Sequence, residues 1–166
     1  MTTHRCPRRL LAVLAWLSLY AVSSAGDAAV FGQQVLFRSG TEKTHTFRIP
    51  AVLTTHKGTI LVLCEARREN GRDHGNIDLV MKRSDDGGSH WGPTRVLFDD
   101  RSHTIGNPCL VTDHRTGTIW LLFSRDNKQV LRSSSTDDGR TWSKPVDITL
   151  SLIHICSCRR KERCSS

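Results

Sequence analysis

An eight-residue pattern, S-x-D-x-G-x-x-W, occurs twice in this chain and limits what the chain can fold into. The copies cover residues 84–91 and 135–142, so they begin 51 residues apart. This interval is close to the period of about 40–50 residues at which four-stranded units repeat in some all-β folds. The recurrence therefore predicts a repeated β-unit that carries one copy of the pattern in each repeat.

Short apolar runs separated by polar turns surround both copies. In the first repeat we expect strands over 47–55, 59–66, 77–83 and 94–98, and in the second over 109–112, 118–124, 130–134 and 144–148. Short β-branched runs bounded by Gly and Asp turns are typical of strands, and no long amphipathic helical pattern interrupts them. The sequence therefore predicts an all-β protein with four strands per repeat.

The residue types of the repeated pattern suit a tight turn. An aspartate can accept backbone N–H bonds, a glycine can adopt positive φ, and a tryptophan can pack a large apolar face between strands. The residues concerned are Ser84, Asp86, Gly88 and Trp91 in the first copy and Ser135, Asp137, Gly139 and Trp142 in the second. We expect all eight to be structural, so function has to come from other residues.

The first 25 residues have the order of a secretory signal peptide. Three arginines precede an apolar run over 10–22, and small residues follow at 23–25. The run is shorter than the roughly 20 residues of a membrane-spanning helix, which disfavours the alternative of an uncleaved anchor. We expect cleavage near Ala25 and export to the medium or the periplasm, or to the lysosome in a eukaryote.

The segment 150–166 lacks the alternation and the turn residues of the rest of the chain. Its start, LSLIHI, resembles the translation of a sequencing-library adapter, so we expect a non-native tail after the domain over 26–149. The alternative is a metal-binding tail, but the spacing of its candidate ligands fits no common zinc site. Those ligands are His154, Cys156, Cys158 and Cys164. We expect neither a metal nor another cofactor.

The net charge of +8 lies mostly at the two ends of the chain. Residues 1–25 and 150–166 each carry +3, which leaves +2 for residues 26–149. This small, mixed charge argues against a nucleic-acid partner. Two of the six cysteines, Cys64 and Cys109, fall in the strand-rich region, and their apolar surroundings predict buried free thiols.

Three further segments carry residues suited to binding and acid–base chemistry. They are Phe47-Arg48-Ile49-Pro50, Cys64-Glu65-Ala66-Arg67-Arg68 and Gly71-Arg72-Asp73-His74-Gly75. In this order, and with the repeated turn pattern, they resemble the bacterial-type exo-α-sialidase (neuraminidase) family. The resemblance covers about residues 33–148. It implies a six-bladed β-propeller of which this chain holds about two blades, with the turn pattern as the Asp box between the third and fourth strands of a blade.

The resemblance also implies roles for single residues. Arg48 corresponds to one of three arginines that grip the carboxylate of sialic acid, a task suited to a planar guanidinium. Arg67 lines the pocket, and the alternation of side chains along a strand turns Arg68 the other way. Asp73 corresponds to the general acid/base, which needs a raised pKa in the bound site. Asn107 either reaches the pocket or forms a turn before Pro108.

The family also uses a tyrosine nucleophile, an assisting glutamate and two more arginines. The single tyrosine is Tyr20, in the predicted signal peptide, and Glu42, Glu65 and Glu69 come too early to match the later glutamate. We therefore expect the full-length protein to cleave sialic acid from sialylated glycans, and this polypeptide alone to aggregate and lack turnover. The alternatives are a non-catalytic propeller that binds glycans or proteins, and a trans-sialidase.

Overall fold

The computed structural model describes residues 32–152, and all of its strands belong to one compact unit that begins at Val35. The predicted signal peptide and residues 153–166 of the predicted tail lie outside the described residues. Over 32–152, no helix is long and apolar enough to cross a membrane.

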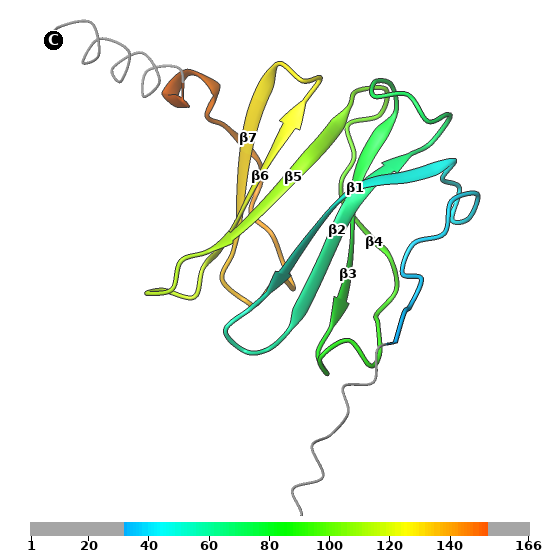
Figure 1. Cartoon of the computed structure of the whole chain (residues 1–166). Coiled ribbons are helices and arrows are strands. Elements are labelled where there is room, and N and C mark those ends of the chain that lie inside the picture. The colour runs from blue at the N-terminus through cyan, green and yellow to red at the C-terminus, as the bar shows by residue number, and fades with distance from the viewer. Residues whose placement is uncertain (1–31, 153–166) are drawn as a thin grey trace, which may run out of the picture. The chain divides into compact units, whose positions relative to one another are not determined.

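The described chain forms two antiparallel four-stranded sheets (Figure 1). The first has the order β1-β2-β3-β4, with β1 at Thr46–Thr54, β2 at Ile60–Arg67, β3 at Ile77–Ser84 and β4 at Arg95–Phe98. The second has the order β5-β6-β7-β8, with β5 at Ile105–Thr112, β6 at Ile119–Arg125, β7 at Gln129–Ser135 and β8 at Val146–Asp147. The predicted all-β class with four strands in each repeat is confirmed.

Most predicted strands end within two residues of the observed bounds, but β5 begins four residues earlier than expected. Its register shifts between Gly106 and Cys109, so Asn107 and Pro108 lie in an irregularity inside the strand. A similar shift separates Arg48 from Ala51 in β1. Proline removes a backbone donor and therefore suggests a strand boundary, although bulges accommodate it.

The hydrophobic core lies between the two sheets. Its buried side chains are Leu61, Leu63, Leu79 and Met81 from the first sheet and Ile105, Ile119, Leu121 and Phe123 from the second. Strand β2 is buried along almost its whole length, because Cys64 and Ala66 on the opposite face of the first sheet pack against Phe37 and against Phe47 of the neighbouring β1. Burial of a Leu, Ile or Phe side chain is worth about 1.5–3 kcal/mol, so this interface is a main source of stability.

The two S-x-D-x-G-x-x-W segments, here called the turn motifs, connect the third and fourth strands of each sheet. In the first, Ser84 Oγ accepts the Gly88 N–H (2.9 Å) and Asp86 Oδ1 accepts the His90 N–H (2.9 Å). The second repeats both bonds: Gly139 N–H to Ser135 Oγ (2.9 Å) and Thr141 N–H to Asp137 Oδ1 (2.8 Å). The two glycines have φ of 95° and 81°, respectively.

The tryptophans of the turn motifs have different surroundings. The Trp91 indole donates to the Gly88 carbonyl (3.0 Å), whereas Trp142 packs against the core between the sheets. The two cysteines of the region differ as well. Both are free thiols, as predicted, and Cys64 is buried, which raises its pKa to about 12. The prediction of burial is wrong for Cys109, which is exposed on β5.

Candidate functional site

Three of the predicted site residues meet at one end of the first sheet. Arg48 lies near the start of β1, Arg67 is the last residue of β2, and Asp73 lies on the loop that follows. The Asp73 Oδ1 atom is 2.7 Å from Arg67 Nη2 and 3.2 Å from Arg48 Nη1. The pairing of β1 with β2 thus places Arg48 beside Arg67 and within reach of Asp73, which lies 25 residues after Arg48 in the sequence.

The backbone next to Arg48 adopts an unusual conformation. Ile49 has φ of 53°, which is rare for a β-branched residue, and it precedes Pro50. Asn107, which also precedes a proline, has φ of 54° on β5. Such conformations cost on the order of 1–3 kcal/mol each and persist where the surrounding structure imposes them. The strained step accompanies the register shift after Arg48 and fixes the backbone at that point.

The Arg67 side chain is buried and fixed by hydrogen bonds. Its side chain is 2% exposed, and Glu65 Oε2 accepts bonds from its Nε (3.1 Å) and Nη2 (2.7 Å). Its Nη1 donates to the carbonyls of Gly71 (2.6 Å) and Arg72 (2.9 Å). With the Asp73 contact, these bonds account for the five N–H donors of a guanidinium. Burial alone would lower the pKa of Arg67, but Glu65 and Asp73 raise it.

Asp73 is open to solvent in this arrangement, with a side chain that is 75% exposed. The hydrogen bond from Arg67 lowers its pKa below the usual value for an aspartate, and the nearby Arg48 adds to the effect. In these surroundings Asp73 is ionised at neutral pH. A raised pKa of Asp73 would require these surroundings to change.

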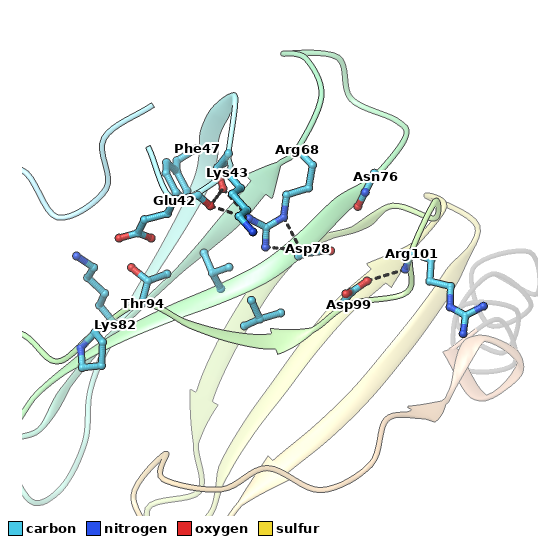
Figure 2. A pocket seen from close by; sticks show the side chains of 14 residues that line it. Glu42, Lys43, Phe47, Arg68, Asn76, Asp78, Lys82, Thr94, Asp99 and Arg101 are labelled. Atoms are coloured by element: carbon cyan, nitrogen blue, oxygen red, sulfur yellow. Dashed lines mark hydrogen bonds and ion pairs between the residues drawn. The ribbon is translucent and has the colours of Figure 1, made fainter. Parts of the chain in front are cut away.

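Arg68 lies on the other side of the sheet from Arg67, as the alternation of side chains predicts. It bonds to Asp78 Oδ2 (2.6 Å) and to Thr44 Oγ1 (2.7 Å). Figure 2 shows Arg68 and Asp78 in a separate hollow, whose lining also includes Phe47. None of Arg48, Arg67 and Asp73 lines that hollow.

Asn107 lies inside β5, so the alternative of a turn former is wrong. Its side-chain amide donates to Ser124 Oγ (2.9 Å) and to Asn127 Oδ1 (3.0 Å). Its backbone N–H donates to Glu65 Oε1 (3.0 Å). Asn107 is thus connected to the Arg67 side of the site through Glu65, while its contact with a ligand stays a prediction.

Glu65 is the residue that the sequence analysis missed as part of the site. Only 4% of its side chain is exposed, and it contacts both Arg67 and Asn107. The signal was present: a carboxylate inside an apolar strand, two residues from Arg67, faces the same side of the sheet as that arginine. A buried carboxylate is rare without a partner, so the pair was predictable.

Comparison with known proteins agrees with this geometry. Residues 58–160 match the family described as "BNR repeat-like domain". The chain is 33% identical over 172 residues to an exo-alpha-sialidase of Arthroderma benhamiae, covering 77% of this chain and 42% of the relative. It is 37% identical over 141 residues to an exo-alpha-sialidase of Aspergillus fumigatus, covering 65% and 34%.

Solved structures match the fold as well. The Hadza microbial sialidase Hz136 has 28% identity and a TM-score of 0.61, covering 67% of this chain and 27% of that chain. A leech intramolecular trans-sialidase reaches a TM-score of 0.60 at 12% identity, covering 74% and 38%, and supports the fold alone.

These matches assign the chain to the class of BNR repeat-like proteins, with two β-propeller blades in the described part. Within that class, it is a member of the sialidase family. It spans 42% and 34% of the two fungal relatives.

Proposed function

We propose that the protein to which this chain belongs is an exo-α-sialidase that hydrolyses terminal sialic acid from glycans. The observation that carries the proposal is the meeting of Arg48, Arg67 and Asp73, in a chain whose sequence relatives are named sialidases. Arg48 is 48% exposed, so its guanidinium is accessible to a ligand carboxylate. Each charge-assisted hydrogen bond to such a carboxylate contributes about 1.5–3 kcal/mol.

The geometry suggests how binding prepares Asp73 as the acid. A ligand carboxylate at Arg48 competes with Asp73 for the positive charge and covers the site from water. Both changes raise the pKa of Asp73 from its lowered value in the free protein. A protonated Asp73 then donates its proton to the glycosidic oxygen, and its carboxylate later activates water.

The proposal includes the finer predictions made from the sequence. The two blades belong to a six-bladed propeller, the turn motifs are Asp boxes, and the remaining blades supply the tyrosine nucleophile, the glutamate and two further arginines. The protein is exported after cleavage near Ala25, and its partners are sialylated glycans whose carboxylate binds Arg48.

The test is release of sialic acid from sialyllactose by the full-length protein, followed by chromatography. We expect free sialic acid and lactose in equal amounts. Appearance of the sugar on an added acceptor glycan instead would indicate a trans-sialidase. Folded protein that binds sialyllactose without releasing sialic acid would contradict the proposal and favour a binding module.

A further inference from the structure

Glu65 lies at the centre of a chain of contacts that runs from the second sheet to the loop of Asp73. Its Oε1 accepts the Asn107 N–H of β5, and its Oε2 accepts two bonds from Arg67. Arg67 in turn bonds to the carbonyls of Gly71 and Arg72 and to the Asp73 carboxylate. One buried carboxylate thus connects an element of the second sheet to the loop that carries the proposed acid.

The missing side chain at Gly106 leaves room for the Glu65 carboxylate. Gly106 lies directly against the carboxylate: a Cβ at that position would be 2.3 Å from Glu65 Oε1. A side chain at position 106 would therefore displace Glu65 from the Asn107 N–H. The absence of a side chain at Gly106 and the positive φ of Asn107 together present the N–H that Glu65 accepts.

The second sheet shows that the blade itself does not need a carboxylate at this position. Glu65 pairs with Arg48 in the first sheet, and Ser124 pairs with Gly106 at the matching place in the second. Ser124 makes local bonds to Gly106 O (3.2 Å) and to the Asn107 amide (2.9 Å). A serine thus occupies the matching strand position in the second sheet, so the strand arrangement alone does not require the carboxylate of Glu65.

We infer that Glu65 is a positioning residue: it orients Arg67, and through Arg67 it holds the 71–73 loop so that Asp73 meets the leaving group. This inference rests on the proposed function. Glu65→Gln keeps one acceptor oxygen and replaces the other by an NH2 group, so the side chain can no longer accept from both Arg67 and the Asn107 N–H. The Arg67 guanidinium, which holds the carbonyls of the 71–73 loop, is then less firmly fixed. Since a displacement of about 1 Å of a catalytic group can cost roughly 100-fold in rate, the effect should fall on proton donation.

Leaving-group dependence separates this role from a merely structural one. A general acid matters most when the leaving group is a sugar alcohol, and least when it is an acidic phenol that leaves without help. We would measure kcat/KM of the full-length protein and its Glu65→Gln variant on sialyllactose and on an aryl sialoside. We expect a loss on sialyllactose that is about tenfold or more larger than the loss on the aryl sialoside.

Asp78→Asn is the matched control, because Asp78 is a buried carboxylate on the same sheet whose arginine partner, Arg68, faces away from Asp73. It should lower both rates by one common factor. Equal losses on the two substrates in Glu65→Gln would overturn the inference, since they would report only less folded protein.

A second variant covers the case in which Glu65→Gln yields too little folded protein. Gly106→Ala leaves the carboxylate in place but pushes it from its site, and it should show the same dependence on the leaving group. Equal losses there would likewise overturn the inference. A folded wild-type protein inactive on both substrates would instead overturn the proposed function, and this inference with it.

Discussion

Two arginines contact Asp73, and solvent reaches them to very different extents. The Arg48 side chain is 48% exposed, whereas that of Arg67 is 2% exposed and bonded through all of its donors. The resemblance to sialidases predicts that both residues line the substrate pocket. The structure separates them: Arg48 is accessible for binding, and Arg67 supports the loop of Asp73.

Arg67→Lys should destabilise the protein even though the charge is kept. A lysine ammonium is a point charge without the planar fork, so it cannot serve Glu65 and the carbonyls of Gly71 and Arg72 at once. We expect the free energy of unfolding in urea to fall by about 1–3 kcal/mol. The control Arg115→Lys changes an exposed loop residue and should fall within about 0.5 kcal/mol of wild type. Equal stability of both variants would contradict the support role of Arg67.

The sequence identifies the residue types that can form the site, but it does not reveal their burial or their contacts. It identified Arg48, Arg67 and Asp73, which the fold brings together. It did not reveal the exposure of Cys109 or the part played by Glu65, because both depend on how the second sheet packs against the first. The lowered pKa of Asp73 likewise requires the distance to Arg67.

At the scale of elements, the turn motifs repeat their hydrogen bonds almost atom for atom in the two sheets. The turn residues, the strand count and most strand bounds were readable from the sequence, since local turn chemistry and alternation determine them. The start of β5 was not, because the bulge at Asn107 depends on pairing with β6.

The aspartates of the turn motifs should make the stability of the protein decrease at acidic pH. The His90 backbone N–H, together with the His90 and Ser84 side chains, lowers the pKa of Asp86 to about 2. The pKa of an aspartate in the unfolded chain is about 3.9. The stabilisation by ionised Asp86 is therefore present above that pH and is lost as the pH falls toward about 2. We expect the difference in urea midpoint between wild type and Asp86→Asn to be largest near neutral pH and to shrink below about pH 4.

The matched control for this pH series is Glu69→Gln, which removes an exposed carboxylate outside the turn motifs. Its midpoint should track that of the wild type throughout. A difference between wild type and Asp86→Asn that stays constant from neutral pH to pH near 2 would contradict the account of the turn.

At the scale of the whole described unit, the two sheets pack through specific close contacts. Gly139 of the second turn motif lies against Leu61 of β2, and a Cβ on Gly139 would be 2.7 Å from Leu61 Cδ1. Leu61 itself is fully buried in the core between the sheets. The turn motif of one sheet thus helps to fix the position of the other.

Gly139→Ala should therefore cost more stability than Gly117→Ala. Both glycines have positive φ, 81° and 72°, but a Cβ at Gly117 would meet no atom within 4 Å. The backbone strain is common to both variants, so the excess loss in Gly139→Ala, about 1–3 kcal/mol for overpacking, reports the contact with Leu61. Calorimetric melting of both variants measures the difference. Equal losses would show that the two sheets do not meet at Leu61.

The proposed function requires Arg48 to bind a carboxylate beside Asp73. The most direct measurement is the affinity of the full-length protein for sialic acid and for its methyl ester, by calorimetry, in wild type and Arg48→Ala. Wild type should bind the free acid at least about tenfold more tightly than the ester, and Arg48→Ala should lose a clear part of this preference, because one charge-assisted hydrogen bond of about 1.5–3 kcal/mol is removed while the two further proposed arginines remain. A preference for the acid that is unchanged in Arg48→Ala would contradict carboxylate binding by Arg48.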